Sequence, residues 1–198
     1  MISVVPVENQ QILYFLMKTE EMDMSGVQPC RNRGFQIEDY DAQMSYATGI
    51  DYLNRRLQNP KVSGIEYSYN KLVGESEGGS YLLKNLRVAL DFDNFYTSGY
   101  DPKGFVGWHS DTDIFGYYIV FAYQGETDAI FRYRDIDTQE IKDFINTPGW
   151  NVFSFTLGKG KDDAVWHCAT SESKRFTFLL HFNTKDKLEK ALSVLTKP

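Results

Sequence analysis

Residues 163–182, DAVWHCATSESKRFTFLLHF, decide the fold class of this 198-residue chain. Residues 163–169 and 174–182 are rich in aromatic and β-branched side chains, and the polar residues 170–173 lie between them. Two short segments of this composition around a polar break predict two strands joined by a turn. The end of the chain therefore indicates a β-rich domain.

Similar short segments precede this pair from about residue 64 onwards, each bounded by Gly, Asp, Asn, Pro or Ser. They are IEYSYNKLV, YLLKNLRVALDFDNFY, FVGWHSD, YYIVFAY, AIFRYRD and NVFSFTL. Their even spacing is typical of an all-β sandwich or barrel. The simplest architecture is a double-stranded β-helix, or jelly roll, over residues 64–183.

Helical patterns flank this core. Residues 8–18 carry apolar side chains at helical spacing, and residues 37–57 do so more loosely, up to Asn59-Pro60. Residues 25–34 between them are typical of a loop, and Lys185–Leu195 has the composition of a helix. We therefore expect one β-rich α+β domain over residues 1–198: a helical N-terminal support at 1–63, the jelly-roll core at 64–183 and a C-terminal helix at 184–198.

Charge and cysteine content restrict the partners. The net charge is -6 and the sequence pI is about 5.1, which disfavours duplex nucleic acid because phosphate attracts basic surfaces. Two cysteines do not make a disulfide framework, so reduced thiols and a cytoplasmic location are expected. No basic region followed by an apolar run opens the chain, and no apolar run reaches 18 residues, so neither a signal peptide nor a membrane span is expected.

The three histidines suggest a metal site. His109 and His167 each follow a tryptophan, and the first continues as His109-Ser110-Asp111. Residues i and i+2 of a strand share a face, so His109 and Asp111 project together. Two histidines and one carboxylate form the facial set of non-heme iron(II) oxygenases. An isolated H-x-D triplet is better explained by a solvated aspartate beside a core histidine, and Asp113 has the same parity as Asp111.

Arginine 175 lies one predicted strand after His167. Arg175 and Thr177 share a face of that strand, and Phe176 and Phe178 share the other. An arginine beside a hydroxyl suits a buried carboxylate, which a guanidinium binds bidentately. The competing interpretation is an arginine on a solvated strand face. His181, the third histidine, lies roughly 20 Å further along this strand at about 3.3 Å per residue, which excludes it as an alternative ligand.

The order His109-x-Asp111, His167, Arg175-x-Thr177 resembles the 2-oxoglutarate and iron(II)-dependent oxygenase superfamily over roughly residues 86–182. Within it, the chain is similar to small hydroxylase-type members among phage and bacterial proteins. The resemblance implies that the triad, with Asp111 rather than Asp113, holds iron(II). It also implies that Arg175, helped by Thr177, binds the distal carboxylate of 2-oxoglutarate, and that dioxygen is the further co-substrate.

Two further elements carry weaker resemblances. Asn94-Phe95-Tyr96 resembles the N-x-Y element of the alkylation-repair branch, where both polar residues help to hold 2-oxoglutarate, although the interval to the H-x-D triplet is longer here. A tyrosine at the end of a strand in an aromatic core explains the same residues. Among Tyr117, Tyr118 and Tyr123, we rank Tyr123 first as the residue that reaches the co-substrate carboxylate, as a tyrosine does in prolyl-hydroxylase-like members.

The surroundings of the site follow from strand alternation and from composition. Trp108 and Trp166 flank the two histidines, so they are expected to point away from the metal and wedge the ligand strands in place. Residues 96–105 contain Gly and Pro and are expected, with residues 25–34, to form loops that rim the site and select the substrate.

The pattern as a whole predicts an oxygenase, with hydroxylation as the default reaction, that couples decarboxylation of 2-oxoglutarate to succinate with oxidation of a second substrate. That primary substrate stays open between a small molecule, a protein side chain and a nucleotide. The alternative is a jelly-roll protein that binds a metal or another ligand without catalysis or without 2-oxoglutarate.

Overall fold

The computed structural model describes residues 2–24, 28–31, 40–58, 67–71, 73–110, 116–157 and 165–198. None of the helices within these ranges combines the length and the apolar character that a membrane crossing requires.

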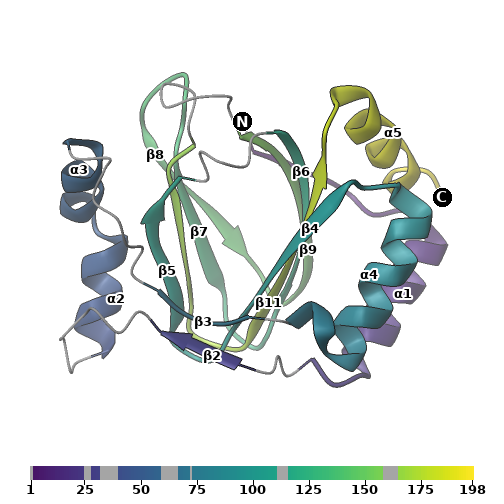
Figure 1. The fold of residues 1–198 in the computed structure, drawn as a ribbon, viewed down its shortest axis with the longest axis horizontal. Coiled ribbons are helices and arrows are strands. Elements are labelled where there is room, and N and C mark those ends of the chain that lie inside the picture. Colours follow the sequence, from purple (N-terminus) through teal and green to yellow (C-terminus); the bar gives the residue numbers. More distant parts are fainter. Residues whose placement is uncertain are drawn as a thin grey trace.

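Eight antiparallel strands form two facing sheets (Figure 1). The first sheet has the order β9-β6-β11-β4 and the second the order β5-β10-β7-β8. The strands are β4 (Asn94–Tyr100), β5 (Gly104–His109), β6 (Gly116–Gln124), β7 (Ala129–Arg134), β8 (Ile141–Asn146), β9 (Gly149–Leu157), β10 (His167–Ser171) and β11 (Arg175–Phe182). Apart from the β7–β8 hairpin, each connection between consecutive strands of this set leads from one sheet to the other. This connectivity is that of a double-stranded β-helix, which confirms the expected β-rich α+β fold.

Three short strands extend these sheets. β3 (Tyr67–Lys71) pairs with both β4 and β5 and so joins the first sheet to the second. β2 (Gln28–Arg31) pairs with β3, and β1 (Ser3–Val4) pairs with β9. Because β2 falls inside residues 25–34, the expectation of a continuous loop there is wrong.

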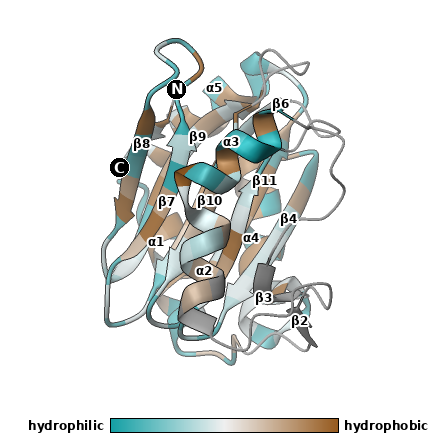
Figure 2. Cartoon of the chain, turned by 90° about the vertical axis from the view of Figure 1, so that its left-hand side faces the viewer, coloured by the Kyte–Doolittle hydropathy of each residue, from teal (hydrophilic) through white to brown (hydrophobic). Residues whose placement is uncertain are grey.

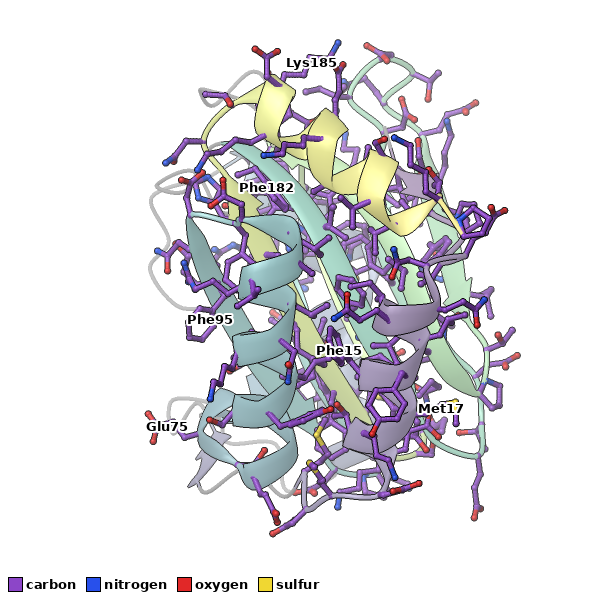
Figure 3. The ribbon with its side chains drawn as sticks, turned by 90° about the vertical axis from the view of Figure 1, so that its right-hand side faces the viewer. Phe15, Met17, Glu75, Phe95, Phe182 and Lys185 are labelled. Carbon is purple, nitrogen blue, oxygen red and sulfur yellow. The ribbon has the colours of Figure 1, made fainter. Side chains whose placement is uncertain are left out.

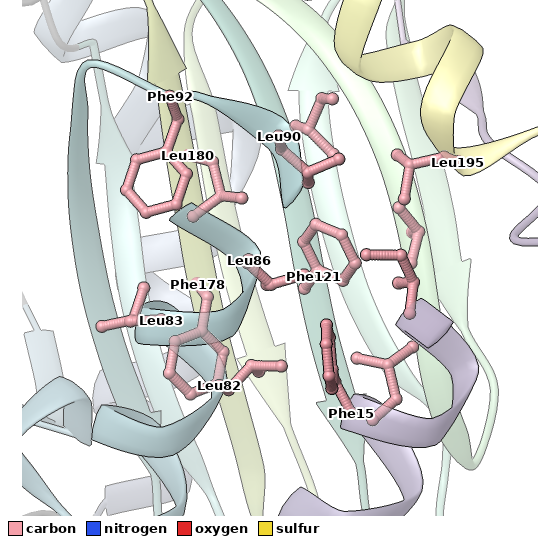
Figure 4. Packing of buried hydrophobic residues seen from close by; sticks show 14 of the residues in the cluster. Phe15, Leu82, Leu83, Leu86, Leu90, Phe92, Phe121, Phe178, Leu180 and Leu195 are labelled. Atoms are coloured by element: carbon pink, nitrogen blue, oxygen red, sulfur yellow. The ribbon is translucent and has the colours of Figure 1, made fainter. Parts of the chain in front are cut away.

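The outer face of the first sheet is covered by α1 (Gln10–Glu20), α4 (Glu77–Leu90) and α5 (Lys185–Leu195), as Figures 1 and 3 show. Their apolar side chains meet those of the sheet in one buried cluster, part of which Figure 4 shows. Its members include Phe15, Leu82, Leu86, Phe121 and Phe178. The helices expected near residues 8–18 and at Lys185–Leu195 are confirmed.

The outer face of the second sheet is covered by α2 (Tyr40–Thr48) and α3 (Ile50–Gln58) (Figure 2). The single helix expected over residues 37–57 is therefore two helices, separated at Gly49. Trp108 is fully buried beneath them in a cluster with Trp166, and its Nε1 donates to the Thr48 carbonyl at 2.8 Å. The expectation that both tryptophans point away from the space between the sheets is confirmed.

The segment YLLKNLRVAL, expected to be a strand, forms most of α4 instead. Ser76 caps this helix by accepting from the Gly79 N–H, and Asp91, with φ of 52°, ends it. The buried leucines recur at helical spacing, which places them all against the sheet. The leucine pattern and the serine cap outweigh the strand character of the aromatic residues that follow.

The expected loop at residues 96–105 is also wrong. β4 continues to Tyr100 and β5 begins at Gly104, so only a three-residue turn joins them, closed by the Gly104 N–H donating to the Asp101 carbonyl. This turn lies beside Arg175, which pairs with Tyr100, at the opposite end of β5 from His109. It therefore does not rim the histidines.

Candidate metal centre and acid-binding pocket

A cavity of about 160 Å³ lies between the two sheets. Both sheets contribute side chains to it. Most of its walls are apolar, including Val106, Val120 and Leu179. Its polar or titratable lining side chains include Tyr96, Tyr100, His109, His167, Arg175 and Thr177. The structure thus brings two predicted metal ligands and the predicted acid-binding pair into one pocket.

The two histidines lie side by side. His109 ends β5 and His167 begins β10, the two residues are register partners, and their ring centroids are 4.2 Å apart. Each Nδ1 lies 2.9 Å from a backbone carbonyl oxygen two residues earlier, that of Gly107 or Val165. A neutral imidazole that donates from Nδ1 presents a lone pair on Nε2, and such second contacts orient metal-binding histidines.

The third predicted ligand, Asp111, lies outside the described residues, as does Asp113. Within the described ranges, no group of three His, Cys, Asp or Glu side chains could hold a metal ion. Asp111 therefore stays a prediction from the sequence. The described part of the centre is a pair of preoriented imidazoles.

Arg175 is a buried cation with no carboxylate partner among the described residues. It is 1% exposed. Its Nη2 donates to Asn146 Oδ1 at 3.0 Å, and its Cζ lies 5.3 Å from the centroid of the Tyr100 ring. Its Nε has no hydrogen-bond partner, and it forms no ion pair in the part of the chain that the structure describes. Burial lowers the pKa of the guanidinium from its ordinary value, but an arginine stays protonated in a protein.

Thr177 supplies a second buried polar atom in the same pocket. Its Oγ1 also lacks a hydrogen-bond partner among the described residues. A buried polar group left unsatisfied costs about 1–3 kcal/mol, and more when the group is charged. A carboxylate would accept from both Arg175 and Thr177, so the donor set fits an acidic ligand.

The three weaker predictions have different outcomes. Tyr96 lines the pocket. Asn94 is exposed at the start of β4 and is not among the lining residues, but its Nδ2 donates to the Tyr96 hydroxyl at 3.5 Å. Tyr123 lies on the outer face of β6, with its ring centroid 5.4 Å from Trp150 and 6.3 Å from Phe176. Because Tyr123 pairs in register with Phe176, it shares that outer face, and its prediction as a co-substrate contact is wrong.

His181 lies near the far end of β11 from Arg175. Its ring centroid is 5.0 Å from that of Tyr118, and it is buried but not among the residues that line the pocket. Its exclusion as a ligand agrees with this position. Tyr118 faces the space between the sheets, opposite to Tyr123, and stacks on Phe155.

Sequence reasoning missed Tyr100 and Asn146. Tyr100 and Tyr96 are four positions apart, so on a strand they share a face. Interpreting residues 96–100 as a strand would therefore have placed Tyr100 in the pocket with Tyr96. Asn146 ends β8, a strand that no predicted segment included. Its contact with Arg175 joins residues 29 positions apart on different sheets, and no local pattern indicates it.

No protein-family model matches the chain, and no curated protein matches it. Among solved structures, the chain is similar to OsALKBH1 (17% identity, 46% of this chain and 48% of that chain, TM-score 0.36). It is also similar to the Escherichia coli ribosomal oxygenase YcfD in complex with cobalt and 2-oxoglutarate (21%, 60% and 32%, 0.38) and to a Pseudomonas putida prolyl-4-hydroxylase (14%, 92% and 99%, 0.36). The chain spans about half the length of OsALKBH1 and about a third of YcfD. Similarity of this extent carries no argument about activity.

Proposed function

We propose that this chain is an iron(II)- and 2-oxoglutarate-dependent oxygenase with hydroxylation as its default reaction. The observation that carries the proposal is Arg175, a buried cation that has no carboxylate partner among the described residues. It lines the same pocket as the paired histidines His109 and His167. A protein that only binds a metal has no need of an acid-binding cation at that position.

The residues divide the task between two ends of the pocket. His109 and His167, with Asp111 as the predicted third ligand, would hold iron(II). Arg175 and Thr177 would bind the distal carboxylate of 2-oxoglutarate. When bound, iron(II) supplies the activation of dioxygen, whose two oxygen atoms end in succinate and in the hydroxylated substrate while carbon dioxide leaves.

The remaining side chains orient the co-substrate and keep water out. The apolar walls of the pocket lower its dielectric and so strengthen the attraction between a carboxylate and Arg175. Tyr96 would add a hydroxyl beside the co-substrate, and Asn94 would act through Tyr96. The primary substrate belongs to one of three classes, a small molecule, a protein side chain or a nucleotide, and the acidic charge disfavours duplex nucleic acid.

Spectroscopy and turnover test this proposal together. Anaerobic addition of iron(II) and 2-oxoglutarate is expected to give the wild-type protein a weak visible absorption band, and aerobic incubation is expected to give succinate. His109→Ala and His167→Ala should lose both. His181→Gln, which removes the third histidine, outside the pocket, should keep both.

Unchanged succinate formation in either ligand variant would overturn the assignment of the histidines. A wild-type protein with no band, and with no change in melting temperature on addition of 2-oxoglutarate, would leave the jelly-roll binding protein as the better description. A screen of substrate classes for stimulated succinate formation, with a mass gain of one oxygen as the readout, identifies the primary substrate.

A further inference from the structure

We propose that Asn146 is a positioning residue for the co-substrate: its neutral amide holds the Arg175 guanidinium from the opposite sheet and leaves the positive charge for the ligand. This inference rests on the proposed function, because it takes the ligand to be 2-oxoglutarate. Asn146 is not among the residues that line the cavity, so it acts through Arg175 and does not touch the ligand.

The contact spans the space between the two sheets. Asn146 is the last residue of β8 in the second sheet, and Arg175 is the first residue of β11 in the first sheet. Asn146 is fully buried, and its Oδ1 accepts from Arg175 Nη2 at 3.0 Å. A guanidinium held at one nitrogen has a fixed direction, which leaves Nε as a donor with no partner among the described residues.

The Asn146 amide and the Tyr100 ring, which lie against the guanidinium, carry no negative charge. The Tyr100 ring lies 5.3 Å from its Cζ, within the range of a cation–π interaction. The register partner of Arg175 is Gln124, whose amide is bonded to the hydroxyls of Ser171 and Ser173. The cation is therefore fixed in place but not neutralised.

The same strand shows the alternative arrangement three residues earlier. Asp143 of β8 pairs with Arg132 through two hydrogen bonds of 2.6 and 2.8 Å. The hydrogen bonds from Arg132 hold the pKa of that carboxyl below its ordinary value. β8 thus presents a carboxylate to a partly exposed arginine and an amide to the buried one. An aspartate at position 146 would make the same kind of pair and occupy the donors that a ligand needs.

The orientation of the Asn146 amide also costs free energy, because it leaves one of its polar atoms unsatisfied. Its Nδ2 is buried and has no partner in the ranges that the structure covers. Rotating the amide would point this NH2 group at the guanidinium, donor against donor, so only the observed orientation is possible. Buried donors are usually satisfied, so an exception calls for an explanation, and a functional role is one of the known ones.

The test compares Asn146→Asp and Asn146→Ala with a matched control, Asn151→Asp. Asn151 lies five positions later, and its amide bonds to the Thr147 and Gly149 carbonyls and not to Arg175. Each variant is loaded with iron(II) anaerobically and titrated with 2-oxoglutarate, and separately with 2-oxopentanoate, which has the same carbon chain without the distal carboxylate. The melting temperature of each ligand-free variant is also measured.

Asn146→Asp should weaken 2-oxoglutarate binding about tenfold to a hundredfold, because hydrogen bonds to charged groups are strong, and should leave 2-oxopentanoate binding unchanged. Its ligand-free melting temperature should stay equal or rise, because the new carboxylate compensates the buried cation. Asn146→Ala should weaken 2-oxoglutarate binding less, and Asn151→Asp not at all.

Two results would overturn the inference while leaving the proposed function intact. One is wild-type affinity for 2-oxoglutarate in Asn146→Asp. The other is a loss of affinity for both acids together with a lower ligand-free melting temperature, which indicates a purely structural asparagine. A wild-type protein that binds no 2-oxoglutarate overturns the proposed function, and this inference with it.

Discussion

The two faces of β11 are both largely buried and are chemically opposite. On the outer face, Phe176, Phe178 and Leu180 belong to a buried cluster of apolar side chains. Figure 4 shows Phe178 and Leu180 within it. On the inner face, Arg175 and Thr177 keep polar atoms without hydrogen-bond partners among the described residues. One strand therefore contributes to stability on one side and to the proposed binding site on the other.

The two faces make opposite contributions to the free energy of folding. Each apolar side chain buried on the outer face stabilises the fold by about 1.5–3 kcal/mol. Each unsatisfied donor on the inner face costs about 1–3 kcal/mol. A ligand that accepts from those donors recovers the second amount on binding. The unsatisfied donors of the inner face therefore lower the free energy of unfolding, and the apolar burial on the outer face offsets that loss.

The largest expected effect is on the outer face. Phe178→Ala should lower the free energy of unfolding by about 3–5 kcal/mol, because it leaves a cavity in the cluster under α4. Urea denaturation measures this loss. Val88→Ala on the exposed side of α4 is the control and should change stability by less than about 0.5 kcal/mol. A loss below about 1 kcal/mol for Phe178→Ala would contradict the close packing of the outer face.

The inner face should respond in the opposite way. Arg175→Met should weaken 2-oxoglutarate binding about tenfold to a hundredfold, because it removes the cation that, in the proposed function, would bind the distal carboxylate. Its ligand-free stability should be unchanged or higher, because a buried, unpaired charge is removed. Ligand titration and urea denaturation measure the two effects.

Arg132→Met is the matched control for this variant. Arg132 pairs with Asp143 on the partly exposed face of the second sheet, so its loss should leave 2-oxoglutarate affinity unchanged. If both arginine variants weakened 2-oxoglutarate binding equally, Arg175 would not be the acid-binding residue.

Two tyrosine variants test the same comparison, with a smaller expected change in 2-oxoglutarate affinity. Tyr96→Phe removes a hydroxyl inside the pocket and should weaken 2-oxoglutarate binding about twofold to tenfold, the worth of one neutral hydrogen bond. Tyr123→Phe removes a hydroxyl on the outer face and should have no effect on this affinity. Equal effects in ligand titrations would show that the two faces of the first sheet are wrongly assigned.

The smallest effect is expected in the turn of the hairpin that carries Asn146. Asp135 accepts from Lys142 Nζ at 2.7 Å and from the backbone N–H groups of Asp137 and Thr138 at 3.0 Å. The hydrogen bond from Lys142, with those N–H groups, lowers the pKa of the Asp135 carboxyl. A lowered pKa means that the charged form stabilises the fold at pH values above about 3.9, the ordinary value, and that this stabilisation is lost as the pH falls towards the lowered value.

Asp135→Asn should therefore be less stable than the wild-type protein at pH 7, and the difference should shrink as the pH falls below about 4. Melting temperatures of both proteins across this range measure the effect. A difference that grows on acidification would contradict the lowered pKa.

The sequence predicted that β11 has one apolar and one polar face, because successive side chains point to opposite faces once Arg175 and Phe176 lie on a strand. It could not choose the face of Tyr123, because β6 is apolar on both faces and its parity carries no information on which side is inside. The contact of Asn146 with Arg175 could not be predicted from the sequence, because the two residues lie on different sheets. Asp111 rests on the sequence alone.

The place of β11 in the first sheet also governs the order in which the protein assembles. β11 is the last of the described strands along the sequence, yet it lies between β6 and β4. During synthesis, β4 and β6 leave the ribosome first, and the edges that they offer to β11 stay unpaired until residues 175–182 emerge. Unpaired edges beside exposed leucines and phenylalanines favour aggregation. Arg175 emerges with β11, so under the proposed function a nascent chain would not bind 2-oxoglutarate before the first sheet has closed.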